Sequence, residues 1–152
     1  MRVALPSEVD ALTQLINAAF QVEKPFFEEE RVNPERVRKF MESGQFLLAE
    51  NSGELAGCVY VKVREGRGYV GLLSVDPAKQ GTGLGRKLME AAEEHFRAAG
   101  CRGVDLRVIS PRTPLPKFYQ HLGYAETGTA PFPADAQCKV QGHYILMSKE
   151  FA

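Results

Sequence analysis

The stretch from Tyr69 to Arg86 reads Tyr-Val-Gly-Leu-Leu-Ser-Val-Asp-Pro-Ala-Lys-Gln-Gly-Thr-Gly-Leu-Gly-Arg. Its first part, Tyr69 to Val75, is an apolar run of strand length that ends in the turn signal Asp76-Pro77. A glycine-rich loop follows, and apolar residues then recur at helical spacing: Leu84, Leu88, Ala91, Ala92, His95, Phe96 and Ala99. The order strand, glycine loop, helix presents free backbone N–H groups at a helix N-terminus, which favours binding of a phosphate group.

Three glycine motifs compete for this loop. A P-loop requires Gly-Lys-Ser/Thr, but Gly85 is followed by Arg86-Lys87-Leu88. The dinucleotide fingerprint requires glycine at position 86 or 88, where this chain has none, and only Asp105 fits its later acidic residue. The third motif, Gln/Arg-x-x-Gly-x-Gly/Ala after a strand, is matched in full from Gln80 to Gly85. Here the chain resembles the GNAT superfamily of acetyl-CoA-dependent N-acetyltransferases, whose acyl-CoA pyrophosphate loop has this pattern.

The composition is that of an ordinary globular domain. The chain has 152 residues, of which 44% are hydrophobic and 25% charged, and its 19 basic residues balance 19 acidic ones. No segment concentrates positive charge and no apolar run has the length of a membrane span, so neither a nucleic acid nor a membrane is expected as a partner. No signal-peptide pattern is present, so we expect a cytoplasmic protein with one domain over residues 1–152. The oligomeric state stays open, a homodimer included.

Three cysteines and three histidines are scattered along the chain: Cys58, Cys101, Cys138, His95, His121 and His143. Their spacing is not that of a metal site or a redox pair. We therefore expect reduced, mostly buried cysteines and no bound metal.

Two helices are predicted before the strands. Ser7, as N-cap, begins a helix that extends to about Val22, and Asn33-Pro34 begins a second one that ends at Ser43-Gly44. The segment between them carries adjacent aromatic and acidic residues: Phe26, Phe27, Glu28, Glu29 and Glu30. It is interpreted either as a solvated linker or as a wall of the acceptor site formed by Phe26, Phe27 and Glu30.

Tight turns join the strands in the middle of the chain. The strands are expected over Gln45 to Glu50, Leu55 to Arg64 and Tyr69 to Val75, with turns at Asn51-Ser52-Gly53 and Glu65-Gly66-Arg67-Gly68. Such a meander is antiparallel, which argues against a Rossmann sheet. Later elements are expected at Val104 to Ile109 (strand), Lys117 to Leu122 (helix), Tyr124 to Thr129 and Gly142 to Lys149 (strands).

A second motif, Lys117-Phe118-Tyr119-Gln120-His121-Leu122-Gly123-Tyr124, is similar to the Leu/Phe-Tyr-x-x-x-Gly-Phe/Tyr segment of the GNAT superfamily. Two motifs in one strand–helix–strand frame are more specific than either alone. The resemblance covers nearly the whole chain. It implies an α/β (α+β) fold with a mixed, mostly antiparallel sheet of about six to seven strands, a splayed central strand pair and about four helices.

The resemblance also implies roles for individual residues. Backbone groups of Leu73, Ser74 and Val75 would pair with the pantetheine arm of acetyl-CoA and polarise the thioester carbonyl. The pyrophosphate would be held by the loop, residues Gln80, Gly81, Thr82, Gly83, Leu84, Gly85 and Arg86. Tyr119 would be the general acid that protonates the CoA thiolate, with a buried packing tyrosine as the alternative. The acceptor would be a primary amine that takes the acetyl group directly in a ternary complex.

Two positions depart from the family pattern. Arg112 stands where many relatives have an asparagine that contacts CoA, and it is expected to contact a CoA phosphate, the acceptor or only solvent. The central strand has no glutamate to act as general base, so the base is unassigned among weak candidates: Glu28, Glu29, Glu30, Glu126 and His143.

Two other functions stay open at this point. A non-catalytic acyl-CoA-binding sensor or regulatory module would keep the loop and lack turnover. A dinucleotide-binding protein would bind NAD in preference to acetyl-CoA.

Overall fold

A seven-stranded sheet with the order β1-β2-β3-β4-β5-β7-β6 forms the centre of the molecule. The computed structural model describes residues 1–20, 32–110, 114–131 and 143–151. The strands are β1 (Arg2–Val3), β2 (Gln45–Asn51), β3 (Glu54–Arg64), β4 (Arg67–Val75), β5 (Gly103–Ser110), β6 (Ala125–Pro131) and β7 (His143–Glu150). Every neighbouring pair is antiparallel except β4 and β5, which are parallel. The predicted mixed, mostly antiparallel sheet is therefore confirmed.

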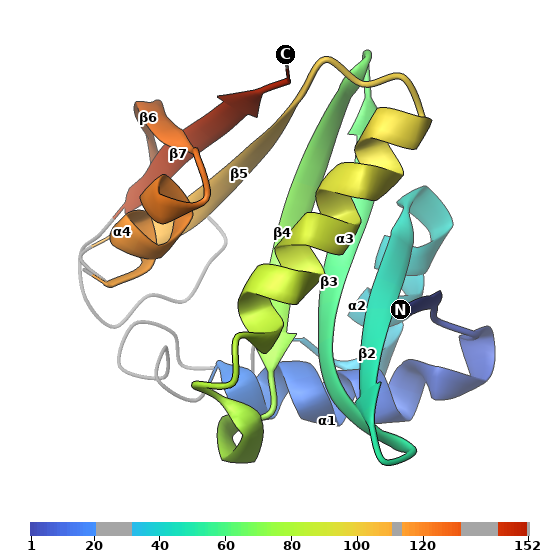
Figure 1. Ribbon diagram of the computed structural model, residues 1–152. Helices are drawn as coiled ribbons and strands as arrows, with labels where there is room; N and C mark the ends of the chain where they lie inside the picture. Colours follow the sequence, from blue (N-terminus) through green and yellow to red (C-terminus); the bar gives the residue numbers. More distant parts are fainter. Residues whose placement is uncertain (21–31, 111–113, 132–142, 152) are drawn as a thin grey trace.

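Helices cover both faces of this sheet (Figure 1). They are α1 (Val9–Ala19), α2 (Pro34–Ser43), α3 (Leu84–Ala98) and α4 (Pro114–His121), with short 3-10 turns at Pro6–Glu8 and Pro77–Lys79. α1 and α2 pack on one face around Leu12, Ile16, Phe46 and Tyr60. α3 packs on the other face, where Leu88, Met89 and Phe96 are fully buried against the strands. The two cores are typical of a sheet with apolar residues on both sides.

The hairpin turns are tighter than the sequence suggested. The turn before β4 is Glu65–Gly66 alone, with φ values of 50° and 79°, and Arg67 and Gly68 belong to the strand. Ser52 and Gly53 form the equivalent turn before β3, with φ values of 55° and 80°. Two consecutive residues at positive φ make the two-residue turn that matches strand twist. The predicted turn over residues 65–68 was therefore too long.

The helix ends correct two further predictions. Ser7 does not cap α1: a 3-10 turn precedes the helix, and the Glu8 carboxylate accepts a hydrogen bond from Leu5 N–H at 2.9 Å while it pairs with Arg2. α4 begins at Pro114, three residues before the predicted start at Lys117, because prolines in a first turn lose no helical hydrogen bond. The predicted cap of α2 is confirmed, since Asn33 accepts from Arg36 N–H at 2.8 Å.

A buried carboxylate ties α3 to the C-terminal part of the sheet. Glu93 is 6% exposed, and it accepts hydrogen bonds from Tyr124 Oη at 3.0 Å and Lys149 Nζ at 2.9 Å. Lys149 also donates to the Leu122 carbonyl at 2.8 Å. Burial and the adjacent Glu93 carboxylate raise the pKa of Tyr124, so its hydroxyl stays a donor.

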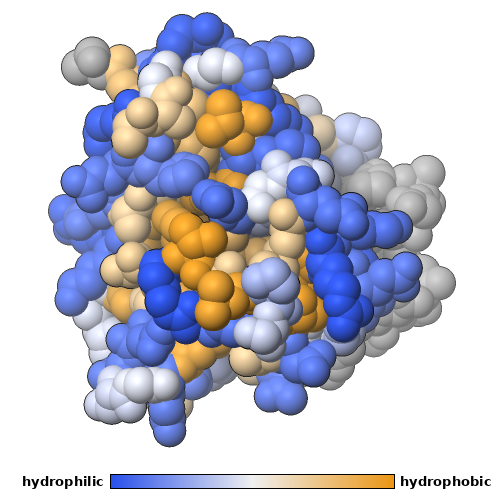
Figure 2. All heavy atoms as spheres, turned by 90° about the vertical axis from the view of Figure 1, so that its right-hand side faces the viewer, coloured by the Kyte–Doolittle hydropathy of each residue, from blue (hydrophilic) through white to orange (hydrophobic). Residues whose placement is uncertain are grey.

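The side of the molecule that carries α2 and β2 shows hydrophobic residues in the middle of a hydrophilic surround (Figure 2). Large apolar side chains that are exposed include Met1, Val3 and Leu5 at the N-terminal edge of the sheet and Val63 on β3. Within the described ranges, no helix combines the length and the hydropathy that a membrane crossing needs.

Candidate active site

The central strands β4 and β5 pair at one end and separate at the other (Figure 1). Their ladder consists of Gly68 opposite Val104 and Tyr69 opposite Asp105, although β4 continues to Val75. Beyond Tyr69, no described strand pairs with the backbone groups of β4 on this side. The predicted splayed strand pair is confirmed, and it leaves a gap with unpaired backbone donors and acceptors.

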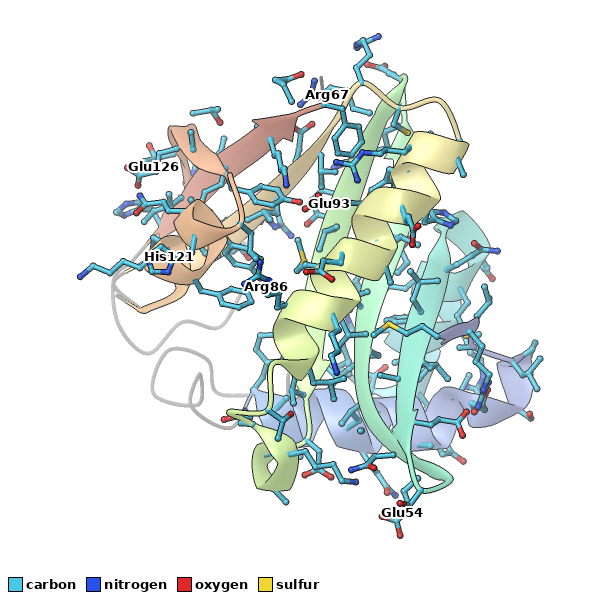
Figure 3. The ribbon with its side chains drawn as sticks, viewed as in Figure 1. Glu54, Arg67, Arg86, Glu93, His121 and Glu126 are labelled. Carbon is cyan, nitrogen blue, oxygen red and sulfur yellow. The ribbon has the colours of Figure 1, made fainter. Side chains whose placement is uncertain are left out.

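Arg67 holds the paired end together. Its guanidinium donates two hydrogen bonds of 2.9 Å to the Asp105 carboxylate on β5, and it also binds Glu150 on β7 (Figure 3). Ser148 donates a further hydrogen bond to Asp105 at 2.7 Å. The hydrogen bonds from Arg67 hold the pKa of Asp105 below its usual value. This Arg67 clamp marks the point from which the two strands diverge.

A β-bulge interrupts β4 beside the gap. Tyr60 pairs with Gly71 and Cys58 with Ser74, so β4 carries one more residue than β3 in this interval, and Leu72 has a φ of 51°. The Leu72 carbonyl oxygen accepts from Ser74 Oγ at 2.9 Å and lies 3.9 Å from Cys58 Sγ on β3. The bulge is thus held by side chains, and the next residue, Leu73, lies in the lining of the gap.

The glycine loop ends at the uncapped start of α3. Gly81 and Gly83 have φ values of 83° and 80°, and a side chain at either position would meet nothing within 4 Å. The first hydrogen bond of α3 runs from Lys87 N–H to the Gly83 carbonyl at 3.1 Å, and no side chain caps the helix. The N–H groups of residues 84–86 consequently have no partner within the helix, and they form a site for an anionic group.

The gap and the loop line one continuous cleft of about 430 Å³, here called the β4–β5 cleft. The predicted site residues that line it are Leu73, Val75, Gln80, Gly81, Gly83, Leu84, Gly85, Arg86 and Tyr119. Ser74 and Thr82 are not among them: Ser74 is 1% exposed, and the Thr82 hydroxyl donates to the Lys79 carbonyl at 2.8 Å. Their side chains stabilise the bulge and the loop instead.

Tyr119 on α4 also lines the cleft. It is 6% exposed and packs edge-to-face on Phe118 and Tyr124, with ring centroids 5.1 and 6.0 Å away. Both Phe118 and Tyr119 line the cleft, whereas Tyr124 does not. The motif that contains Tyr119 thus places one tyrosine in the cleft and one against Glu93.

Sequence reasoning missed several lining residues that come from other elements. Phe20 follows α1, Arg107 lies on β5, and Tyr144 lies on β7. The Arg107 guanidinium stacks on the Tyr144 ring at 4.3 Å from its centroid. In the sequence of β5, Arg107 lies between the apolar residues Leu106 and Val108, so it is expected on the face away from the core. The sequence alone does not show which strand lies beside it.

A second depression of about 740 Å³ lies on the α2 side of the sheet. It shares Tyr69, Leu106 and Arg107 with the β4–β5 cleft, so the two spaces meet where β4 and β5 separate. A group held in one space can therefore reach a group held in the other.

The described residues of the two spaces leave the general base unassigned. Asp105 is the carboxylate among the described lining residues, and it is tied to Arg67. Glu126 on β6 (Figure 3) and His143 at the start of β7 are exposed and line neither space. Five other predicted residues, Phe26, Phe27, Glu28, Glu29 and Glu30, lie outside the described residues, as does Arg112.

The described cysteines do not line the cleft or the adjoining depression. Cys58 is fully buried, and burial raises the pKa of its thiol to about 12. Cys101 is 8% exposed and also lines neither space. Neither thiol is placed to carry an acyl group. Within the described ranges, no cluster of side chains has the composition of a metal site.

The comparisons with known proteins agree with this geometry. Residues 9–124 match the acetyltransferase (GNAT) family. The chain belongs to this family of acyltransferases. Mycothiol acetyltransferase of Streptomyces avermitilis is 31% identical over 130 residues, which are 82% of this chain and 42% of that protein. The enzyme of the same name from Saccharopolyspora erythraea is 38% identical over 96 residues, 62% of this chain and 32% of that protein. The chain thus spans less than half the length of these curated relatives.

Solved GNAT structures share the fold. The ribosomal-protein-S18-alanine N-acetyltransferase of Escherichia coli matches with a TM-score of 0.79 at 17% identity, over 99% of this chain and 92% of that chain. The yncA protein of Salmonella typhimurium, solved with its cofactor acetyl-CoA, matches with a TM-score of 0.77 at 19% identity, over 99% of this chain and 92% of that one. At these identities the likeness shows the GNAT fold.

Proposed function

We propose that this protein transfers an acetyl group from acetyl-CoA to a primary amine, by direct attack in a ternary complex. The observation that carries the proposal is the β4–β5 cleft. It joins a glycine loop at an uncapped helix N-terminus to a bulged strand whose Leu73 lines the gap. The first feature fits a pyrophosphate and the second fits the carbonyl of an acyl group. Acetyl-CoA, with which related structures are solved, carries both groups and supplies an activated acetyl thioester.

Different residues would bind the cofactor, stabilise the transition state and protonate the leaving group. N–H groups at Gly83 to Arg86 bind the phosphates, and the free edge of β4 beyond Tyr69 pairs with an extended pantetheine arm. Leu73 N–H donates to the acyl oxygen, on which negative charge grows as the amine attacks, so it stabilises the transition state more than the ground state. Tyr119 then donates its phenolic proton to the departing sulfur.

The amine nitrogen must lose a proton during this transfer. The described lining residues offer Asp105 as a carboxylate, but the Arg67 clamp occupies it. We infer that the acceptor enters as the free amine and that its proton leaves to water. The rate at subsaturating acceptor should therefore rise with pH as the ammonium form of the acceptor is lost.

A panel of primary amines tests the proposed function. CoA release is measured at saturating acetyl-CoA, and the acetylated product is identified by mass spectrometry. The proposal expects turnover with at least one class of amine. Acetyl-CoA binding by calorimetry without turnover for any amine would instead favour the sensor function. A thermal shift with NAD that exceeds the shift with acetyl-CoA would favour a dinucleotide-binding protein.

A further inference from the structure

The depression on the α2 side of the sheet has an unusual charge. The whole chain balances 19 basic against 19 acidic residues. The lining of this depression, however, includes five cationic residues, Arg36, Lys39, Lys62, Arg64 and Arg107, and one carboxylate, Asp105. Together they define what is here called the basic pocket. A neutral protein has concentrated positive charge at the place where the acceptor would enter.

The five cations converge from three elements. Arg36 and Lys39 are one helical turn apart on α2, and Ser43 continues the same face toward the pocket. Lys62 and Arg64 lie on the same face of β3 as Tyr60, because side chains two residues apart in a strand point to the same side. Arg107 comes from β5, across the gap. No single element explains the cluster, so it arises from the folded arrangement.

Among the described residues these cations form no salt bridge with a carboxylate, although Arg64 lies close enough to Asp105 to help lower the pKa of that carboxyl. The one acidic lining residue, Asp105, receives two hydrogen bonds from Arg67 and one from Ser148. Arg64 and Arg107 lie on aromatic rings instead, with each guanidinium carbon 4.3 Å from the centroid of Tyr69 or Tyr144. Stacking holds a guanidinium in place and leaves its N–H groups able to bind an anion.

The basic pocket is concave and partly aromatic. Its volume of about 740 Å³ lies in the range of small-molecule sites. Phe40, Tyr60 and Tyr69 supply apolar walls. Tyr69, Leu106 and Arg107 also line the β4–β5 cleft, so an amine anchored by an anionic group in the pocket can meet the acyl group at the shared boundary.

We propose that the acceptor is a small amine that carries a carboxylate or a phosphate group, which the basic pocket binds. The proposal rests on the proposed function and adds the chemical class of its second substrate. A neutral amine would leave the cations without a counter-charge, whereas an anionic one forms charge-assisted hydrogen bonds with them.

Matched pairs of acceptors test the substrate class. Each pair has the same amine with and without its anionic group: an amino acid and its carboxamide, and an amino sugar phosphate and the free amino sugar. The anionic member of at least one pair should have a kcat/KM higher by about tenfold or more, the size of a charged hydrogen bond. The pair that shows the preference distinguishes carboxylate from phosphate. Neutral members that react as well as the anionic ones would overturn the proposal.

Variants of α2 locate the effect in the pocket. Arg36→Gln with Lys39→Gln removes two lining cations, and Arg38→Gln is the matched control, because Arg38 is exposed on the same helix and outside the lining. The double variant should raise KM for the anionic acceptor by about tenfold and leave KM for acetyl-CoA unchanged. The control should match the wild type in both. A double variant that behaves like the control would contradict the proposal.

A binding experiment separates this inference from the proposed function. Inorganic phosphate and succinate are titrated by calorimetry into protein saturated with CoA, so that the phosphate loop is already filled. Binding of either anion that is lost in the double variant and kept in Arg38→Gln supports the basic pocket even if no amine is acetylated, in which case only the proposed function fails. No binding of either anion to the wild type would count against the pocket.

Discussion

At the scale of single residues, two tyrosines of one short motif lie in different surroundings. Tyr119 lines the β4–β5 cleft, and Tyr124 donates to the buried Glu93 carboxylate at 3.0 Å. Both are almost fully buried, so burial alone does not distinguish them. We propose a catalytic role for Tyr119 and a structural one for Tyr124, because Tyr119 lines the cleft and Tyr124 does not.

We predict that Tyr119→Phe lowers kcat by about a hundredfold, the usual size of a general-acid contribution. Acetyl-CoA affinity should stay nearly unchanged, because the ring remains. Tyr124→Phe is the control: it should lower the free energy of unfolding by about 1 kcal/mol, since Glu93 loses a buried donor, and leave kcat unchanged. Steady-state kinetics and urea unfolding of both variants provide the measurement. Wild-type kcat in Tyr119→Phe would assign Tyr119 to packing.

At the scale of elements, the Arg67 clamp joins β4 to β5 at the short stretch where these two strands pair. Because the pKa of Asp105 is lower in the folded protein than the unfolded value of about 3.9, the clamp stabilises the fold fully above that value. Its contribution is lost as the pH falls through the folded pKa of Asp105. Arg67 stays protonated throughout, so the carboxylates alone set this dependence.

Asp105→Asn should therefore be less stable than the wild type by ~1 kcal/mol at neutral pH, as expected for a partly exposed but bidentate ion pair. The difference should shrink as the pH falls below the unfolded value of about 3.9, because protonation of the wild-type carboxyl removes the ion pair. Urea unfolding at neutral and at acid pH measures it. Glu54→Gln is the control, since Glu54 is exposed and lies 3.6 Å from Lys79 in a surface pair. A stability difference that stays constant with pH would exclude this role for Asp105.

The sequence predicted local features well at this scale. Hydrophobic runs and turn residues gave the strand meander, and the Asn33 cap and the glycine loop were readable because their geometry depends on neighbouring residues. Glu93 was missed, because an acidic residue inside an apolar helical stripe shows no sign of the distant Tyr124 and Lys149 that bind it. Arg67 was assigned to a turn, because its partners lie on β5 and β7.

At the scale of the whole molecule, the site is where elements far apart in the sequence meet. The loop and Tyr119 were predictable from motifs, since each lies within one local segment. The basic pocket was not, because α2, β3 and β5 contribute its cations separately and the net charge of the chain is zero. Tertiary arrangement, rather than composition, created that local field.

We propose that the glycine loop and the adjoining β4–β5 cleft bind acetyl-CoA, and calorimetric titration of acetyl-CoA into Gly83→Asp is a direct test. Gly53→Asp is a matched control, because both glycines have a φ of 80° and nothing within 4 Å of an added Cβ, while Gly53 lies in the turn between β2 and β3, outside the lining of the cleft. The backbone strain should therefore be alike, whereas only the aspartate at position 83 adds negative charge beside the phosphates. We expect Gly83→Asp to weaken acetyl-CoA binding by about a hundredfold or more, as is typical of an unpaired charge in a phosphate site, and Gly53→Asp to bind like the wild type. Unchanged affinity in a folded Gly83→Asp would contradict the proposal.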